Sequence, residues 1–183
     1  MIRVIGGKYK GKRLKHVPGG DVRPMPHKLK ESLFSIIKSG VIDSVFLDGF
    51  SGTGSVGIEA LSRGARLAVF LEESYPAVKV IRSNLQKCGA EDQALVIHRE
   101  FNRGVIRLAG EGLKFSLVFL DPPYALLDRR NPLKIINKRE VLEPSGTIIL
   151  RHHFKTDFHA KYFSLKRQVT IGDDTLSFYT HDL

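Results

Sequence analysis

The chain has 183 residues, 42% of them apolar, which suffices for one domain with one sizeable core. Its only cysteine, Cys88, excludes an internal disulfide and a zinc site built from paired cysteines, so we expect a core residue there and no bound metal. No apolar run is long enough to cross a membrane and no signal peptide is recognisable, which favours a cytoplasmic protein without membrane partners.

The formal net charge of +10 is concentrated in the first forty residues, where ten Lys or Arg face two acids and give a net charge of +8. Such a cluster is typical of proteins that bind polyanions, although a merely solvated surface can have the same composition. The charge therefore favours a nucleic-acid partner only modestly. The cations that we expect to contact phosphates are Arg3, Lys8, Lys10, Lys12, Arg13 and Arg23.

Residues 1–40 are predicted to form a small basic extension. Strand-like runs at Ile2–Ile5 and Arg13–Val17, separated by glycines, predict a β-hairpin. Apolar residues at helical spacing between Pro24 and Gly40 then predict one helix. We assign residues 41–183 to a separate main domain.

The main domain alternates strands with helices, and this order predicts an α/β fold with a mainly parallel sheet covered on both faces. The last segment contains two strand-like runs around Gly172-Asp173-Asp174, which predict a terminal antiparallel hairpin. The expected strands are Val45–Leu47, Leu67–Leu71, Leu95–Ile97, Leu117–Leu120 and Thr147–Leu150. The expected helices are Val56–Arg63, Tyr75–Lys87, Asn102–Ala109 and Pro132–Val141.

The stretch FLDGFSGTGSVGIEAL follows the first of these strands and opens a helix, which is the context that a nucleotide-binding glycine loop requires. Its glycines allow a sharp turn and the close approach of a ligand to the helix N-terminus. The spacing alone does not distinguish a dinucleotide from other cofactors, so a dinucleotide-dependent oxidoreductase stays an alternative.

Two acids at strand ends favour a different cofactor. Asp48, before the glycines, would repel a pyrophosphate and attract a cationic amino-acid group, and Glu72 is placed to accept hydrogen bonds from both hydroxyls of a ribose. A ribose and a cation without phosphates describe S-adenosylmethionine, whereas the simpler alternative makes Asp48 a cap and Glu72 a surface charge. We expect the cofactor to be held by Asp48, Ser51, Gly52, Gly54 and Glu72.

The stretch LDPPY ends the fourth expected strand, at the sheet edge where open parallel sheets bind their ligands. Pro122 and Pro123 fix a stiff turn, so that the carboxylate of Asp121 and the carbonyl of Pro122 would present two acceptors beside the ring of Tyr124. Two acceptors and a ring suit the exocyclic amino group of a nucleobase as methyl acceptor. The alternative is a proline turn with a capping aspartate, which does not explain its position at this edge.

DPPY in this position resembles a motif of methyltransferases that modify nucleobase amino groups. Nearly the whole chain resembles the RsmD-type 16S rRNA guanine-N2 methyltransferases, through IRVIGGKYKGKRL, KESLF, LDGFSGTGSVGIEALSRGA, LDPPY and GDDTLSFY. The resemblance implies a Rossmann-like class I fold, S-adenosylmethionine as donor and a guanine of 16S rRNA, guanine 966, as target. It also implies that the basic extension faces RNA, which is 16S rRNA alone or in the assembling small ribosomal subunit, and that Glu100 lies near the adenine amino group.

The chain differs from the pattern of this family at several positions: Lys30, Ser35 and Gly49 in the N-terminal half, Glu100 in place of an aspartate, and Arg151 where an acid is frequent. Within the same chemistry, the alternative substrate is adenine N6 of DNA. The alternative that is not an enzyme is a non-catalytic RNA-binding protein that has kept a methyltransferase fold. We expect a monomer, and we interpret His152, His153 and His159 as surface or RNA-facing groups because neighbouring residues on a strand point to opposite faces.

Overall fold

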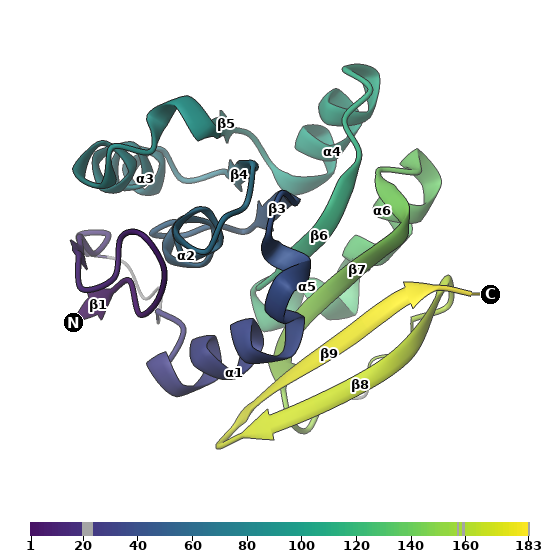
Figure 1. The fold of residues 1–183 in the computed structure, drawn as a ribbon. Coiled ribbons are helices and arrows are strands. Elements are labelled where there is room, and N and C mark those ends of the chain that lie inside the picture. Colours follow the sequence, from purple (N-terminus) through teal and green to yellow (C-terminus); the bar gives the residue numbers. More distant parts are fainter. Residues whose placement is uncertain (20–23, 157, 159, 183) are drawn as a thin grey trace.

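The computed structural model describes residues 1–19, 24–156, 158 and 160–182. A seven-stranded sheet crosses the molecule in the order β5-β4-β3-β6-β7-β9-β8 (Figure 1). Five strands are parallel: β3 (Val45–Gly49), β4 (Leu67–Glu72), β5 (Ala94–His98), β6 (Phe115–Leu120) and β7 (Leu142–His153). The last two, β8 (Phe163–Ile171) and β9 (Asp174–His181), are antiparallel. The predicted strand order along the chain and the terminal hairpin are confirmed.

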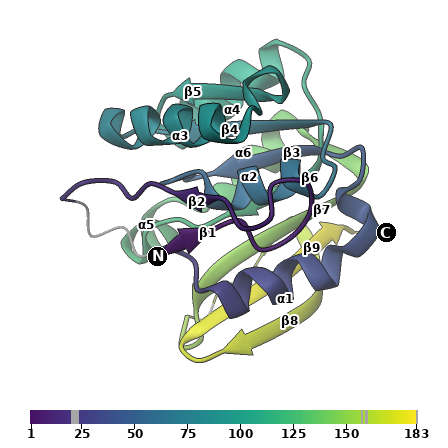
Figure 2. The ribbon, with the colours of Figure 1, turned by 60° about the vertical axis from the view of Figure 1, so that its left-hand side comes forward.

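Helices cover both faces of the sheet, as the strand–helix alternation predicted (Figures 1 and 2). Successive residues of β4 alternate between two cores: Phe70 enters one with the apolar residues of the first three helices, and Val69 and Leu71 enter the other. The first face carries α1 (His27–Ile37), α2 (Ser55–Ser62) and α3 (Tyr75–Cys88). The second carries α4 (Phe101–Gly110), α5 (Tyr124–Arg129) and α6 (Pro132–Arg139). Two short 3₁₀ turns, η1 (Lys38–Val41) and η2 (Glu91–Gln93), complete the described helices.

The N-terminal hairpin is shorter than predicted, with only two residues in each strand: β1 (Ile2–Arg3) and β2 (Arg13–Leu14). Figure 2 shows it beside α2. Ile2 and Leu14 are buried in the same core as α1, α2 and α3. The backbone N–H groups of Ile5, Gly6 and Tyr9 donate to side chains of α2.

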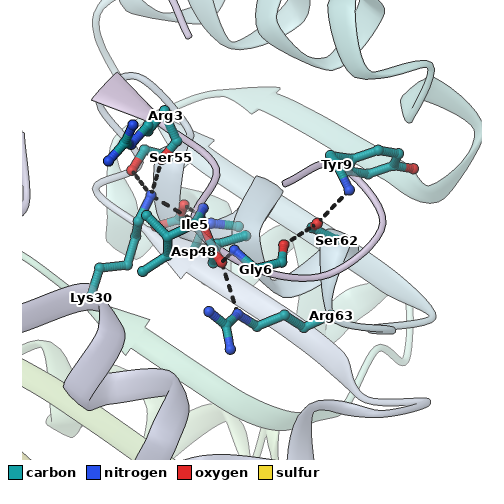
Figure 3. Close-up of polar contacts among 11 residues, drawn as sticks. Arg3, Ile5, Gly6, Tyr9, Lys30, Asp48, Ser55, Ser62 and Arg63 are labelled. Atoms are coloured by element: carbon teal, nitrogen blue, oxygen red, sulfur yellow. Dashed lines mark hydrogen bonds and ion pairs between the residues drawn. The ribbon is translucent and has the colours of Figure 1, made fainter. Parts of the chain in front are cut away.

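Glu59 is the centre of the contacts that fasten this extension to α2. Figure 3 shows its neighbours Ile5, Gly6 and Arg63 close together. Its fully buried carboxylate accepts hydrogen bonds from the backbone N–H groups of Ile5 and Gly6 at 2.9 and 2.8 Å. It also accepts one from Arg63 Nε at 2.8 Å and lies 3.3 Å from Nζ of Lys30, which is equally buried. Lys30, noted in the sequence only as a departure from the family, is therefore an internal ion-pair partner.

Asn84 makes a second connection, between the extension and the glycine loop. Its side chain is fully buried on α3; it accepts a hydrogen bond from Lys15 N at 2.7 Å and donates to the carbonyl oxygen of Thr53 at 3.0 Å. Cys88, at the end of the same helix, is buried as predicted.

Besides the hairpin, two elements differ from the sequence prediction. The strand β7 starts at Leu142, five residues before the predicted start, because a register shift between Phe115 and Leu117 of β6 allows it to accommodate Pro144 and Gly146. The helix α5 was not predicted, since six residues after two prolines are too few to show a helical period. In the part of the chain that the structure describes, no helix is long and apolar enough to cross a membrane.

Candidate active site

The glycine loop lies between β3 and α2, and its conformation depends on residues that tolerate a left-handed backbone. Gly52 and Gly54 have φ values of 56° and 76°, and Gly54 directly precedes the first residue of α2. Gly57 is required for another reason, because a Cβ atom there would lie 2.4 Å from the ring of Phe70. This glycine lets the helix approach β4 closely.

Asp48, predicted to attract a cationic group, is the penultimate residue of β3, directly before the glycine loop, and is almost completely buried. Its Oδ2 accepts a hydrogen bond from Gly57 N at 2.8 Å, so the carboxylate also caps the start of α2. Burial raises the pKa of Asp48 well above its ordinary value, and the nearby carboxylates of Asp121 and Glu72 raise it further. A cationic ligand beside Asp48 would oppose all of these effects.

Glu72 and Ser51 brace the loop against β4. The two carboxylate oxygens of Glu72 accept hydrogen bonds from Gly52 N and Ser74 N, each at 2.8 Å. The hydroxyl of Ser51 lies 2.6 Å from the carbonyl oxygen of Asp48 and 3.2 Å from that of Leu71. Glu72 is half-buried, and each of its oxygens keeps a lone pair that a ribose hydroxyl could use.

Glu100 and Phe101 lie at the start of α4, beside the glycine loop at the same edge of the sheet. Glu100 caps the helix by accepting a hydrogen bond from Arg103 N at 3.2 Å, and its Oε1 lies 3.8 Å from Arg130. The ring of Phe101 stacks on that of Phe50, with centroids 4.7 Å apart. A Cβ atom at Gly49 would lie 2.7 Å from the Phe101 ring, so the glycine at this departure from the family makes room for the aromatic pair.

The proline turn follows β6, the neighbour of β3, at the point where the strand order reverses. The carboxyl ends of these two strands are adjacent, which brings Asp121 to the same edge as Asp48 and the glycine loop. Pro122 is buried and Pro123 is exposed, directly before α5. Tyr124 is the first residue of α5; its side chain lies outside the described part of the structure, so the predicted stacking ring stays a prediction.

Arg151 was missed as a site residue by sequence reasoning, which noted it only as a departure from the family. It lies in β7, two residues before the last residue of that strand, and is buried except for 7% of its surface. Its Nη1 donates to Asp121 Oδ2 at 2.8 Å and its Nε donates to Asp174 Oδ1 at 3.0 Å. The available signal was its position, because Arg151 directly follows the predicted strand Thr147–Leu150, as Asp121 directly follows the paired strand that ends at Leu120.

The prediction that His152 faces the surface is wrong. His152 is 3% exposed and its Nε2 lies 2.7 Å from the hydroxyl of Ser177. The cause is the pairing of β9 with β7, which the sequence pattern did not indicate. His153 is half-buried, and His159 lies outside the described residues. Among the residues that the structure describes, no three His, Cys, Asp or Glu side chains gather in a way that could hold a metal ion.

Cations gather on two surfaces. On the extension, Arg3, Lys8, Lys10, Lys12 and Arg13 are exposed as an RNA contact requires, whereas Arg23 lies outside the described residues. The second surface is a cavity of about 550 Å³ among α4, α5 and α6, which no sequence argument indicated. Arg130, Lys134 and Lys138 line it together with Asn102 and Asn131. Because α5 directly follows the proline turn, this cavity lies beside the candidate site.

Comparison with known proteins was made by sequence and by structure. Residues 2–180 match the model of a family described as "Conserved hypothetical protein 95". The Bacillus subtilis protein YlbH is 36% identical over 151 residues, which cover 82% of each chain. The Haemophilus influenzae protein named "Ribosomal RNA small subunit methyltransferase D" is 33% identical over 149 residues, or 80% of this chain and 76% of that protein.

Solved structures share the fold over nearly the whole chain. A hypothetical protein from Thermus thermophilus superposes with a TM-score of 0.84 at 28% identity, covering 98% of this chain and 99% of its own. An RNA methyltransferase from Salinibacter ruber, in complex with S-adenosyl-L-homocysteine, superposes with a TM-score of 0.68 at 22% identity, covering 87% of this chain and 94% of its own. The predicted class I methyltransferase fold is confirmed.

Proposed function

This chain belongs to the RsmD-type rRNA methyltransferases, the family described as "Conserved hypothetical protein 95", and we propose that it methylates the exocyclic N2 amino group of a guanine in 16S rRNA, guanine 966. The observation that carries the proposal is the position of Asp121, at the reversal point of the strand order and directly beside the glycine loop. Its side chain is 29% exposed and can therefore meet a substrate.

S-adenosylmethionine is the methyl donor, and the charges of the site fit it better than they fit a dinucleotide. Asp48 and Glu72 flank the glycine loop, where a pyrophosphate would be repelled. We propose that Glu72 accepts hydrogen bonds from the ribose hydroxyls, that Asp48 attracts the cationic methionine group, and that Glu100 faces the adenine amino group. When bound, the donor supplies a methyl group activated by its sulfonium charge.

Asp121 and Pro122 act on the other reactant. Oδ2 of Asp121 is held by Arg151, whereas Oδ1 makes no hydrogen bond to any described residue and is available to the guanine amino group. We propose that Oδ1 and the Pro122 carbonyl accept the two amino hydrogens, which turns the nitrogen lone pair toward the methyl carbon. As the nitrogen–carbon bond forms and the carbon–sulfur bond breaks, the charge of Asp121 opposes the positive charge on nitrogen until a proton is lost to solvent. Pro123 fixes the turn, and we propose that Tyr124 stacks on the base.

Two basic surfaces support an RNA substrate. The exposed cations of the extension and the cavity lined by Arg130, Lys134 and Lys138 both present positive charge that backbone phosphates could neutralise. The cavity lies beside the proline turn, so a strand bound there would continue away from the reacting base. We propose that the cavity holds nucleotides close to the target and that the extension contacts more distant rRNA.

The experiment that tests this function offers tritium-labelled S-adenosylmethionine to unmethylated small subunits, naked 16S rRNA and duplex DNA in parallel. We expect label in the small subunit or its rRNA, and N2-methylguanosine after digestion to nucleosides. Label in DNA as N6-methyladenine would favour the alternative substrate. Donor binding without transfer to any of the three would favour a non-catalytic RNA-binding protein.

The Asp121→Ala variant separates the two halves of the site. It should abolish transfer and leave donor binding, measured by calorimetry, largely intact, because Asp121 is assigned to the acceptor side. Loss of both together would show that Asp121 has a structural role.

A further inference from the structure

Arg151 joins two carboxylates from different strands at the edge where the proposed chemistry takes place. It follows the Leu120–Leu150 pair of β6 and β7, and its guanidinium bridges Asp121 of the proline turn to Asp174 of β9 through separate nitrogens. All three side chains are largely shielded, with exposed fractions of 9%, 29% and 16% for Arg151, Asp121 and Asp174. Shielding makes such a pair stronger and better defined than a surface ion pair.

We propose that Arg151 and Asp174 are positioning residues for methyl transfer, which hold the Asp121 carboxylate with Oδ2 bound and Oδ1 turned toward the substrate amino group. The inference rests on the proposed function, because it assigns these residues a role in orienting the acceptor. It also makes the C-terminal hairpin a part of the reacting edge, since Asp174 is the first residue of β9 and directly follows the turn at Gly172 and Asp173.

The guanidinium of Arg151 is itself held in place by Asp174, which is why orienting Asp121 requires both Arg151 and Asp174. An arginine anchored at one end only could turn with Asp121 and would not fix its direction. Here Nε is bound to Asp174, so the direction in which Nη1 reaches Asp121 is set by the planar group. A lysine would keep the charge but would replace the two-point fork by a point charge.

The same contacts control the charge of Asp121. Burial raises the pKa of Asp121 above its ordinary value, and Arg151 opposes that shift by interacting with the ionised carboxylate. The charged groups that face Asp121 are Arg151 of β7, Asp174 of β9 and Asp48 of β3. Only Arg151 among them is cationic, so an acid at position 151 would bring four carboxylates together without a counter-charge.

The test compares the unaltered protein with Arg151→Gln, Arg151→Lys and Asp174→Asn, and with Arg107→Gln as the control. Arg107 also donates from Nε to a carboxylate at 2.8 Å, but its pair with Glu111 is exposed. Circular dichroism and calorimetric binding of S-adenosylmethionine establish that each variant is folded. Carbon-13 titration of the Asp121 carboxyl, assigned with an Asp121→Asn variant, then measures the ion pair without any substrate.

We expect Arg151→Gln to raise the pKa of the Asp121 carboxyl and to move the acidic limb of the kcat profile to higher pH. The kcat above that limb should fall roughly 10- to 100-fold, the cost of a misplaced reacting group, with little change in donor affinity. Asp174→Asn should lower kcat by a smaller factor, Arg151→Lys should restore the pH profile more than kcat, and Arg107→Gln should change neither.

Three results would decide against the inference or its premise. An Asp121 carboxyl that titrates identically in the unaltered protein and in Arg151→Gln would show that the pair does not form in solution. A shifted titration with an unchanged kcat profile would leave the pair real and overturn its positioning role. Absence of methyl transfer by the unaltered protein on every substrate would overturn the proposed function instead, and the positioning role with it, while the titration would still decide whether the ion pair exists.

Discussion

Replacing Glu59 by glutamine should destabilise the protein far more than the same replacement at Glu111. Both carboxylates pair with an arginine four residues away across the end of a helix, and in both pairs Oε1 lies 2.8 Å from the arginine Nε. Their surroundings differ. Glu59 is fully buried, faces Lys30 and accepts two backbone N–H groups of the extension, whereas the side chain of Glu111 is 41% exposed.

The size of the effect follows from what glutamine leaves behind. Removing one partner of a buried ion pair costs roughly 3–5 kcal/mol, because the remaining charge of Lys30 stays buried without compensation. A buried backbone N–H that faces the amide NH₂ group would cost about 1–3 kcal/mol more. A domain of this kind has only about 5–15 kcal/mol of stability, so Glu59→Gln should remove a large part of it. An exposed i,i+4 pair contributes about 0.3–0.5 kcal/mol, which sets the expected loss for Glu111→Gln.

Urea unfolding followed by circular dichroism measures both losses by linear extrapolation. A second variant tests whether the loss comes from the unpaired charge of Lys30. Adding Lys30→Met to Glu59→Gln removes that charge and should recover part of the stability. The reasoning would be refuted if Glu59→Gln stayed within about 1 kcal/mol of the unaltered protein, or if the double variant were less stable than the single one.

Three further predictions concern the glycine loop, the buried acid and the cavity. Gly57→Ala would place its methyl group 2.4 Å from the Phe70 ring, so the free energy of unfolding should fall by an overpacking cost of about 1–3 kcal/mol, and the melting temperature and donor affinity should fall with it. Gly110→Ala, with nothing within 4 Å, should be neutral. The folded-state pKa of Asp48 is raised, so the free energy of unfolding falls as pH rises from the unfolded pKa of 3.8 through the folded pKa. Urea unfolding at about pH 5 and about pH 8 should therefore show a smaller loss of stability in Asp48→Asn than in the unaltered protein. An equal loss in both proteins would contradict the assignment. Replacing both Lys134 and Lys138 by Glu should raise KM for rRNA and reduce the slope of log affinity against log salt by about 2, with little effect on donor binding. Lys166→Glu on the edge strand is the control. An equal effect of this control would show that net charge, and not the cavity, determines the affinity for RNA.

The sequence was sufficient for the parts of the molecule that depend on neighbours along the chain. Asp48, Glu72 and Asp121 each lie at or directly beside the carboxyl end of an apolar strand, and parallel strands bring such ends to one edge, so their common location followed from order alone. The same argument could have found Arg151, which directly follows the predicted strand Thr147–Leu150.

What the sequence could not supply was pairing between distant segments. The hydrogen bonds from Ile5 and Gly6 to Glu59 span more than fifty residues, and nothing in the pattern of α2 distinguishes Glu59 from a surface acid. His152 was misassigned for a related reason, because its burial depends on which strand pairs on the far side of β7. In both cases the burial of the polar side chain depends on tertiary contacts that the local pattern does not contain.

The strand β8 forms one open edge of the sheet, and its sequence disfavours pairing of that edge with a strand of another molecule. Its register with β9 shifts between Leu165 and Arg167, so the backbone there is bent where a flat strand would present regular unpaired donors and acceptors. Lys166 and Arg167 lie at that bend and are exposed, and charges at an irregular edge discourage a second strand from adding to it. The half-exposed Leu165 is thereby kept from becoming the start of an intermolecular sheet.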